Sequence, residues 1–293
     1  MTRHRGGGRW RLAALATAAI AAWQAVPGGA PGPPAVLERL HAYLDAYEPK
    51  LSELVADEDF RQELRSTDFY RPTDMPRDQL VRQHLIADFG FLRLPGDDAW
   101  LGHRSVRMVD GVAVLDEARR LERLLATAAD RDLARLARAI ADENARHNLG
   151  HARSMNVPTL ALELLGRRHA AEFTLASQRA ARMGGRRTTR LFLRERHPGR
   201  LVAFDDTRAN RADVAVWIDE AGAVVRADVT LFPPRMLGQH TLRVDFAPNA
   251  QFGILVPVRL EERFNGKARG SGVATYTNYR RFQTSGRLLP PGR

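Results

Sequence analysis

Hydrophobic and polar residues alternate with a period of two along much of the second half of the chain. Val224–Phe232, His240–Phe246 and Ile254–Leu260 all carry this pattern. Such alternation predicts strands with one apolar and one polar face. The turn Glu220–Gly222 is expected to join Val214–Asp219 to the strand that follows it. We therefore expect a nearly all-β region after residue 170, with roughly eight strands.

The first half begins with a helix and continues with strands. Apolar residues from Val36 to Val55 recur at three-to-four spacing, which predicts one helix that Pro49 kinks or divides. Phe60–Phe69, Gln79–Leu94 and Ala99–Met108 have strand-like sequences separated by turn residues. About three antiparallel strands are thus expected before the next helices.

A helical stretch interrupts the strands. Leu121–Ala128 and Leu133–Asn144 carry apolar stripes, and Gly150 is the expected C-cap of the second helix. A short helix is expected to start after Pro158 and to end at Gly166.

The final strand, Val273–Gln283, follows two predicted turns, Asn265–Lys267 and Gly270–Gly272. A long sheet with one apolar face must cover that face or curl around itself. We therefore predict an α+β fold: a large curved antiparallel sheet, a half-barrel of roughly eleven strands, with the N-terminal helix and the inserted helices on its concave face.

The N-terminus has the pattern of an export signal. Met1–Arg11 is basic, Leu12–Trp23 is an uninterrupted apolar run, and small residues follow. The run is too short to cross a hydrocarbon core, which takes about 20 residues, so no stable transmembrane span is expected. An uncleaved anchor is the alternative. The expected divisions are a signal peptide at 1–30, a Pro/Gly linker at 31–35, one domain at 36–285 with a helical insertion at about 116–168, and a disordered tail at 286–293.

The formal charge of +11 does not indicate nucleic-acid binding. The first 30 residues carry four arginines and no acid, which leaves 41 basic against 34 acidic residues in the remainder. Arginine alternates with acidic residues there and forms no basic run. The absence of cysteine excludes disulfides, zinc–thiolate sites and thiol nucleophiles.

Four local motifs accompany this order of elements behind a signal peptide: Phe89–Pro95, Val109–Gly111, Val216–Asp219 with Gly222, and Gly272–Tyr276 with Tyr279. Together, the element order and these motifs resemble the periplasmic lipoprotein-carrier superfamily, which contains the outer-membrane lipoprotein carrier and its receptor relative. The tail also resembles exported bacterial proteins with no assigned activity. The resemblance spans about residues 36–285, and it implies a half-barrel that holds acyl chains in an apolar cavity.

Large apolar residues of the C-terminal strands are the candidates for lining such a cavity, although the same residues would equally build a filled core. An apolar pocket gains about 0.8 kcal/mol per buried methylene, so an acyl chain needs no special polar motif. The candidates are Phe192, Trp217, Val229, Leu231, Leu242, Val244, Phe246, Val256 and Val258.

A polar cluster lies between the predicted helices: Glu143, Arg146, His147, Asn148 and Asn156. It is expected to line a cleft or to form a buried hydrogen-bond network that fixes the turn into Pro158. Glu143 and His147, four residues apart, could reach a metal with His151, but without a His-Glu-x-x-His motif we expect no metal and no cofactor.

Nucleophile motifs are absent from the sequence, so a catalytic role is not expected. The expected function is that of an exported, non-catalytic protein that binds a lipid or an acylated lipoprotein. Envelope proteins are possible further partners. Two alternatives stay open: an envelope protein-interaction or sensor module without a small ligand, and a metal-dependent hydrolase.

Overall fold

The structure is a computed structural model of the chain. Residues Ala35–Arg293 form one compact unit, separate from Met1–Pro34. The predicted signal peptide, the C-terminal tail and the predicted helix at 121–128 lie outside the described residues. Those described are 34–68, 77–93, 100–115, 133–150, 155–199, 201, 211–232 and 238–265, with 268–281 at the end.

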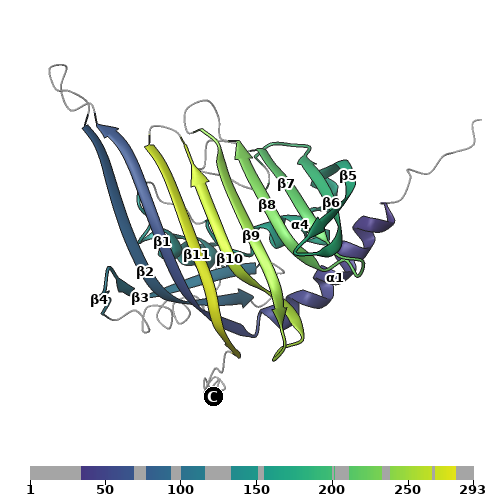
Figure 1. The fold of residues 1–293 in the computed structure, drawn as a ribbon, viewed down its shortest axis with the longest axis horizontal. Coiled ribbons are helices and arrows are strands. Elements are labelled where there is room, and N and C mark those ends of the chain that lie inside the picture. Colours follow the sequence, from purple (N-terminus) through teal and green to yellow (C-terminus); the bar gives the residue numbers. More distant parts are fainter. Residues whose placement is uncertain are drawn as a thin grey trace, which may run out of the picture. The chain divides into compact units, whose positions relative to one another are not determined.

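Eleven strands form one antiparallel sheet (Figure 1). Its order, β4-β3-β2-β1-β11-β10-β9-β8-β7-β6-β5, places the last strand beside the first. The strands are β1 (Leu54–Asp68), β2 (Arg77–Arg93), β3 (Trp100–Val109), β4 (Val112–Ala113), β5 (Phe173–Met183), β6 (Arg186–Glu195), β7 (Arg211–Ile218), β8 (Val224–Phe232), β9 (His240–Asn249), β10 (Ile254–Phe264) and β11 (Ala268–Arg281).

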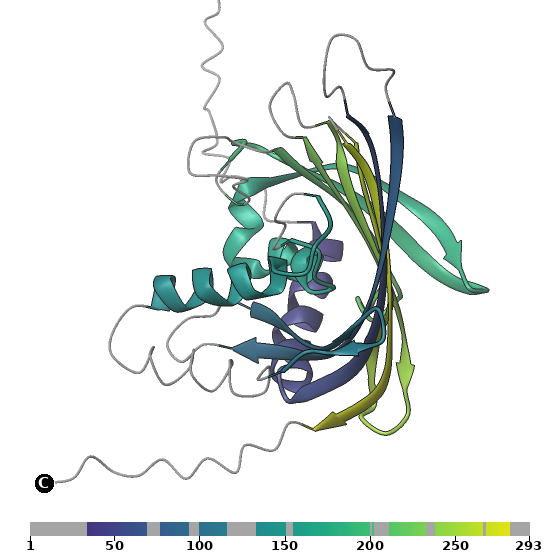
Figure 2. The same ribbon diagram turned by 90° about the vertical axis from the view of Figure 1, so that its left-hand side faces the viewer.

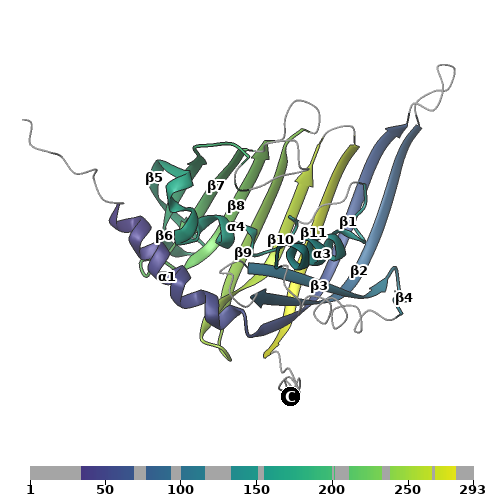
Figure 3. The ribbon, with the colours of Figure 1, turned by 180° about the vertical axis from the view of Figure 1, so that it is seen from behind.

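The helices of the described residues cover a single face of this sheet (Figure 2). They are α1 (Ala35–Leu51), α3 (Leu133–Ala145), α4 (Leu160–Leu165) and the 3₁₀ helix η1 (Arg167–Glu172). The sheet curves around them, and β3 curls over onto the same side (Figures 2 and 3). This confirms the predicted half-barrel with helices on its concave face.

The first helix differs from its prediction. α1 is continuous through Pro49 and ends at Leu51, so Leu54 and Val55 start β1 instead of extending the helix. Pro49 lies in the last turn of α1, so the hydrogen bond that its missing N–H cannot make is at the end of the helix, and only two helical residues follow it. The hydroxyl of Ser52 donates to the carbonyl of Pro49 (2.9 Å) and thereby satisfies one acceptor at the helix end.

Gly150 is not the C-cap of α3, which ends five residues earlier at Ala145. Gly150 instead has a positive φ of 83° and lies against β1, where an added Cβ would come within 3.2 Å of Leu64. Its role is therefore a close approach of the backbone to the sheet. The short helix α4 starts and ends as predicted, with Gly166 at its C-cap.

Gly270 and Gly272 lie inside β11, not in the predicted turn before it. A Cβ on Gly270 would lie 2.0 Å from the ring of Phe264, and one on Gly272 would lie 2.6 Å from the ring of Phe60. These glycines make room for aromatic rings of the two neighbouring strands, Phe264 of β10 and Phe60 of β1. The strand total matches the prediction, but four strands precede the helices and seven follow them, because Val112–Ala113 pairs with β3.

Candidate functional site

The concave face of the C-terminal strands is apolar. Alternation along each strand directs every second side chain to this face. Five of the nine residues predicted for a cavity share this face by alternation and are buried in the core: Val229, Leu231, Leu242, Val244 and Phe246. Val256 is also buried, and Val258 packs half-buried against the core at a register shift of β10.

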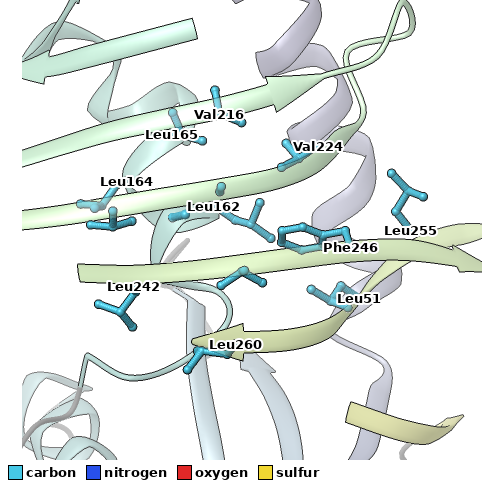
Figure 4. Close-up of a cluster of buried hydrophobic side chains, with 14 of the residues drawn as sticks. Leu51, Leu162, Leu164, Leu165, Val216, Val224, Leu242, Phe246, Leu255 and Leu260 are labelled. Atoms are coloured by element: carbon cyan, nitrogen blue, oxygen red, sulfur yellow. The ribbon is translucent and has the colours of Figure 1, made fainter. Parts of the chain in front are cut away.

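Side chains of the helices cover this face. Leu40, Leu44 and Leu51 of α1 are almost completely buried, as are Leu162 and Leu165 of α4. The close-up shows leucines of α4, together with Leu51, beside Val216, Leu242 and Phe246 (Figure 4). The predicted lining residues therefore contact helix side chains where the face is covered.

Phe192 and Trp217 lie elsewhere. Phe192 stands between the buried Leu191 and Leu193, and Trp217 between the buried Val216 and Ile218. Alternation therefore turns both rings to the opposite face of the sheet. There the guanidinium of Arg190 lies 5.2 Å from the Trp217 ring centre and 5.9 Å from that of Phe192. These two aromatics form an arginine–aromatic cluster apart from the other seven residues.

An apolar hollow of about 440 Å³ opens between α1 and the turn that joins β9 to β10. We call it the α1 hollow. Its volume falls within the range of small-molecule sites, roughly 300–1,000 Å³. Tyr47 and Leu255 belong both to its lining and to the core, so the hollow borders the core directly. It is lined by Tyr43, Ala46, Tyr47, Lys50, Ala223, Pro248, Asn249, Ala250, Gly253, Ile254 and Leu255.

Tyr47 brings a polar atom into this apolar setting. Its ring stacks on that of Tyr43, with centres 5.2 Å apart. Burial raises the pKa of Tyr47 well above its usual value, so the hydroxyl stays protonated. Within the described part of the chain this buried hydroxyl has no hydrogen-bond partner. An unsatisfied buried hydroxyl is costly, and a bound polar group or water would relieve that cost.

A second feature of the concave face is a buried ion pair between Arg104 of β3 and Glu58 of β1. Nε of Arg104 donates to one carboxylate oxygen (2.5 Å) and Nη2 to the other (2.9 Å). The hydroxyl of Tyr276 donates to the same carboxylate (3.0 Å). Burial lowers the pKa of Arg104, but the Glu58 carboxylate outweighs this and raises it overall. Arg104 therefore stays protonated and positively charged.

The same arginine fastens the helical segment to the sheet. Nη2 of Arg104 donates to the carbonyl of Asn156 (3.1 Å), and Nη1 contacts the carbonyl of Asn144 at 3.5 Å. The side chain of Asn144 accepts from the backbone of Arg104 (2.7 Å) and donates to the carbonyl of Gly102 (2.5 Å). Residues at both ends of the connection from α3 to α4 are thus tied to β3.

The network continues across the sheet to β10 and β9. Nδ2 of Asn156 donates to Glu262 (3.4 Å), whose carboxylate also contacts Nε2 of His240 (2.9 Å). Gln62 of β1 donates to the carbonyl of His147 (2.9 Å) and accepts from the backbone of Leu149 (3.2 Å). Buried polar groups satisfied in this way fix one arrangement of the covering segment.

The predicted polar cluster contributes to this network. Asn156 is fully buried and donates to the side-chain oxygen of Asn148 (2.9 Å). His147 contributes a backbone carbonyl. Glu143 forms an ion pair with Arg146 (3.0 Å). The contacts of Asn148 and Asn156 place their side chains in the buried network.

No metal site is found among the described residues, since no three His, Asp or Glu side chains come together there. His151, which completed the candidate metal triplet, lies outside them. Over the same described ranges, no helix has the length and apolar character needed to cross a membrane.

Glu58 and Arg104 were missed by sequence reasoning. Glu58 stands in an acidic run, Asp57–Asp59, that looks like a solvated strand face. The alternation along β1 could have indicated that Glu58 is buried. Side chains two residues apart point to the same face of a strand, and Ala56 and Phe60 on either side of Glu58 are buried.

Known proteins similar to this chain are found by comparison of structures and not by comparison of sequences. No family model matches the chain, and no curated protein matches it. One similar structure is a putative outer membrane lipoprotein-sorting protein domain from Vibrio parahaemolyticus, with 11% identity over 86% of this chain and 94% of that one, and a TM-score of 0.34. Another is a LolA superfamily protein from Nitrosomonas europaea, with 12% identity over 84% and 94%, and a TM-score of 0.26.

Proposed function

We propose that this chain is an exported, non-catalytic protein that binds an acyl chain of a lipid or lipoprotein at the concave face of its sheet. The α1 hollow carries the proposal. It is apolar, it borders the core, and it is lined by Tyr47, whose buried hydroxyl has no hydrogen-bond partner among the described residues. An acyl chain would bury its methylenes at about 0.8 kcal/mol each, while its polar end stays near Tyr47 and Lys50.

A larger cargo needs more of the apolar face than this hollow offers. The segment from α3 to α4 covers the face and is held by the polar contacts of Arg104 with Asn144 and Asn156. Polar contacts of this kind have defined geometry and can be exchanged for water when the segment lifts. Lifting would expose leucines of α4 and the strand residues beneath them. Export follows from the N-terminal signal pattern.

Blocking the α1 hollow tests the proposal. Ala250 lines the hollow and is exposed, so Ala250→Trp would fill the hollow without enlarging the core. We expect this change to weaken binding of a fluorescent long-chain fatty acid at least about tenfold, because several methylenes lose their apolar contact. Ala180→Trp on the exposed side of β5 is the matched control and should leave binding unchanged. Thermal unfolding of both variants checks that the fold is kept.

Equal binding by the two variants would place the ligand outside the α1 hollow. Native mass spectrometry of the purified protein supplies the second measurement. A bound lipid would identify the ligand class. An apo mass that stays unchanged after incubation with lipids would contradict lipid binding and favour the interaction-module alternative.

A further inference from the structure

A second hollow, of about 880 Å³, lies at the end of the sheet where β9, β10, β11 and β1 meet. Cross-strand pairing places its residues in two rows. Arg65 pairs with Leu80 on one side and with Arg269 on the other. Ser271 lies between Glu63 and Arg263, and Arg263 pairs with Thr241. We call this the arginine hollow.

The rows face away from the helices. Arg65 and Glu63 alternate with Leu64 and the buried Gln62, whose side chain contacts the helical segment. Residues of opposite parity point to opposite faces of a strand. The three arginines of this hollow and the α1 hollow therefore lie on different faces of the sheet.

Among the described residues that line it, the arginine hollow has more positive than negative charge. The carboxylate of Glu63, the acidic group among them, is paired with Arg82 outside the hollow (2.7 Å). In the part of the chain that the structure describes, Arg65, Arg263 and Arg269 have no acidic partner within 4 Å. Arg65 and Arg269 stand directly opposite each other, and like charges in that position destabilise a sheet.

Arginines farther along the same face are paired. Arg226 contacts Asp245 across the strands (2.5 Å), and Arg243 contacts Asp228 (2.8 Å). Among the described residues of β1, β10 and β11, Arg65, Arg263 and Arg269 lie together without such a pair. An anion bound between them would replace the missing carboxylates.

We propose that the arginine hollow binds a phosphate-bearing organic ligand. A guanidinium group can donate two parallel hydrogen bonds to phosphate oxygens. The hydroxyl of Ser271 lies in the same row as Arg263 and is a further donor. The hollow is too large for phosphate alone, and Leu80, 42% exposed, supplies an apolar wall for the organic part. Such a phosphate belongs either to the headgroup of an anionic phospholipid or to a soluble phosphate ester.

Binding measurements on the full chain and two triple variants test this. In R65Q/R263Q/R269Q the hollow loses its three charges. The control, R179Q/R182Q/R187Q, makes the same charge change on exposed positions of the β5–β6 hairpin. Because all three proteins keep the same apolar N-terminal segment, its own affinity for membranes cancels in the comparison. The probes are vesicles of phosphatidylglycerol, vesicles of phosphatidylcholine, and soluble glycerol 3-phosphate followed by calorimetry.

We expect the hollow variant to bind at least about tenfold more weakly than wild type, and the control to stay within about twofold. Loss confined to phosphatidylglycerol vesicles assigns the hollow to a phospholipid headgroup. Loss that includes glycerol 3-phosphate assigns it to phosphate esters in general. Equal affinities of the two variants, or no binding of any probe by wild type, would overturn the proposal.

Discussion

Arg104 and Glu58 form a charged pair in a part of the core with almost no solvent exposure. The guanidinium also lies 4.7 Å above the ring of Phe60. Removing one partner would leave an uncompensated buried charge, which costs about 3–5 kcal/mol. We therefore expect Arg104→Met to lower the free energy of unfolding by this amount, measured by urea denaturation.

The second partner and a surface pair provide the controls. Glu58→Gln in the Arg104→Met background removes the stranded charge and should recover part of the loss. Arg61→Met breaks the exposed pair with Asp59 and should cost no more than about 1 kcal/mol. Suppose that Arg104→Met lowers the free energy of unfolding as little as Arg61→Met does. The Glu58 carboxylate is then not left as an uncompensated buried charge, and the interpretation of the pair is wrong.

His103 makes the stability depend on pH. Burial, reinforced by Arg104 and opposed by Glu143, lowers the pKa of His103 to about 4. Its unfolded value is near 6.5, so between pH 6.5 and 4 the unfolded chain binds the proton and the folded protein does not. The contribution of neutral His103 is thus fully present above pH 6.5 and is lost as the pH falls towards 4. The loss amounts to about 3 kcal/mol.

His103→Gln isolates this contribution. We expect the variant to show a flatter dependence of unfolding free energy on pH between 6.5 and 4 than wild type, in denaturation series at matched salt. An unchanged slope would assign the acid sensitivity to other groups, such as the buried His41 of α1, whose pKa is also lowered by burial.

At the scale of elements, α1 depends on the turn between β7 and β8. Gly222 in this turn has φ of +87°, and an added Cβ would lie 2.6 Å from the carbonyl oxygen of Arg39 in α1. Gly185 has φ of +80° but open space around it. Gly185→Ala should therefore cost only the left-handed strain of about 1 kcal/mol. Gly222→Ala should cost about 1–3 kcal/mol more, because α1 must shift.

Denaturant unfolding of the two alanine variants measures this difference. Fluorescent fatty-acid binding by Gly222→Ala then shows whether a shift of α1 changes the α1 hollow. Equal stability losses for Gly222→Ala and Gly185→Ala would mean that the turn does not hold the helix.

Periodicity predicted the elements well where one face is apolar throughout, as in β8 and β9. Periodicity predicted the wrong element or the wrong burial where contacts between strands determine a residue's position. Gly270 and Gly272 look like turn residues, yet they belong to β11 because rings of neighbouring strands need their space. Glu58 and Arg104 look like surface residues, since a local pattern cannot show that each buries the charge of the other. The candidate cavity set includes Phe192 and Trp217 because both are large and apolar, although alternation directs them to the other face of the sheet.

At the scale of the whole molecule, the two ends of the domain meet in the middle of the sheet. β1 pairs with β11, and Tyr276 reaches Glu58 across 218 positions of the chain. Pairing this distant is slow to form, because the entropy of closing the loop is lost before the contacts are gained. β1–β4 and β5–β10 are joined in the sheet only through β11.

We therefore expect a chain that ends at residue 265 to lose cooperative unfolding, although it retains ten of the eleven strands. Without β11, the strands β1 and β10 expose unpaired edges in place of a continuous core. Near-ultraviolet circular dichroism during heating measures the loss, and adding a peptide of residues 268–281 should restore part of the transition. Cooperative melting of the truncated chain near the full-length temperature would show that the halves fold independently. The concave face would then consist of two independently folded surfaces. A ligand bound to one half would not stabilise the other.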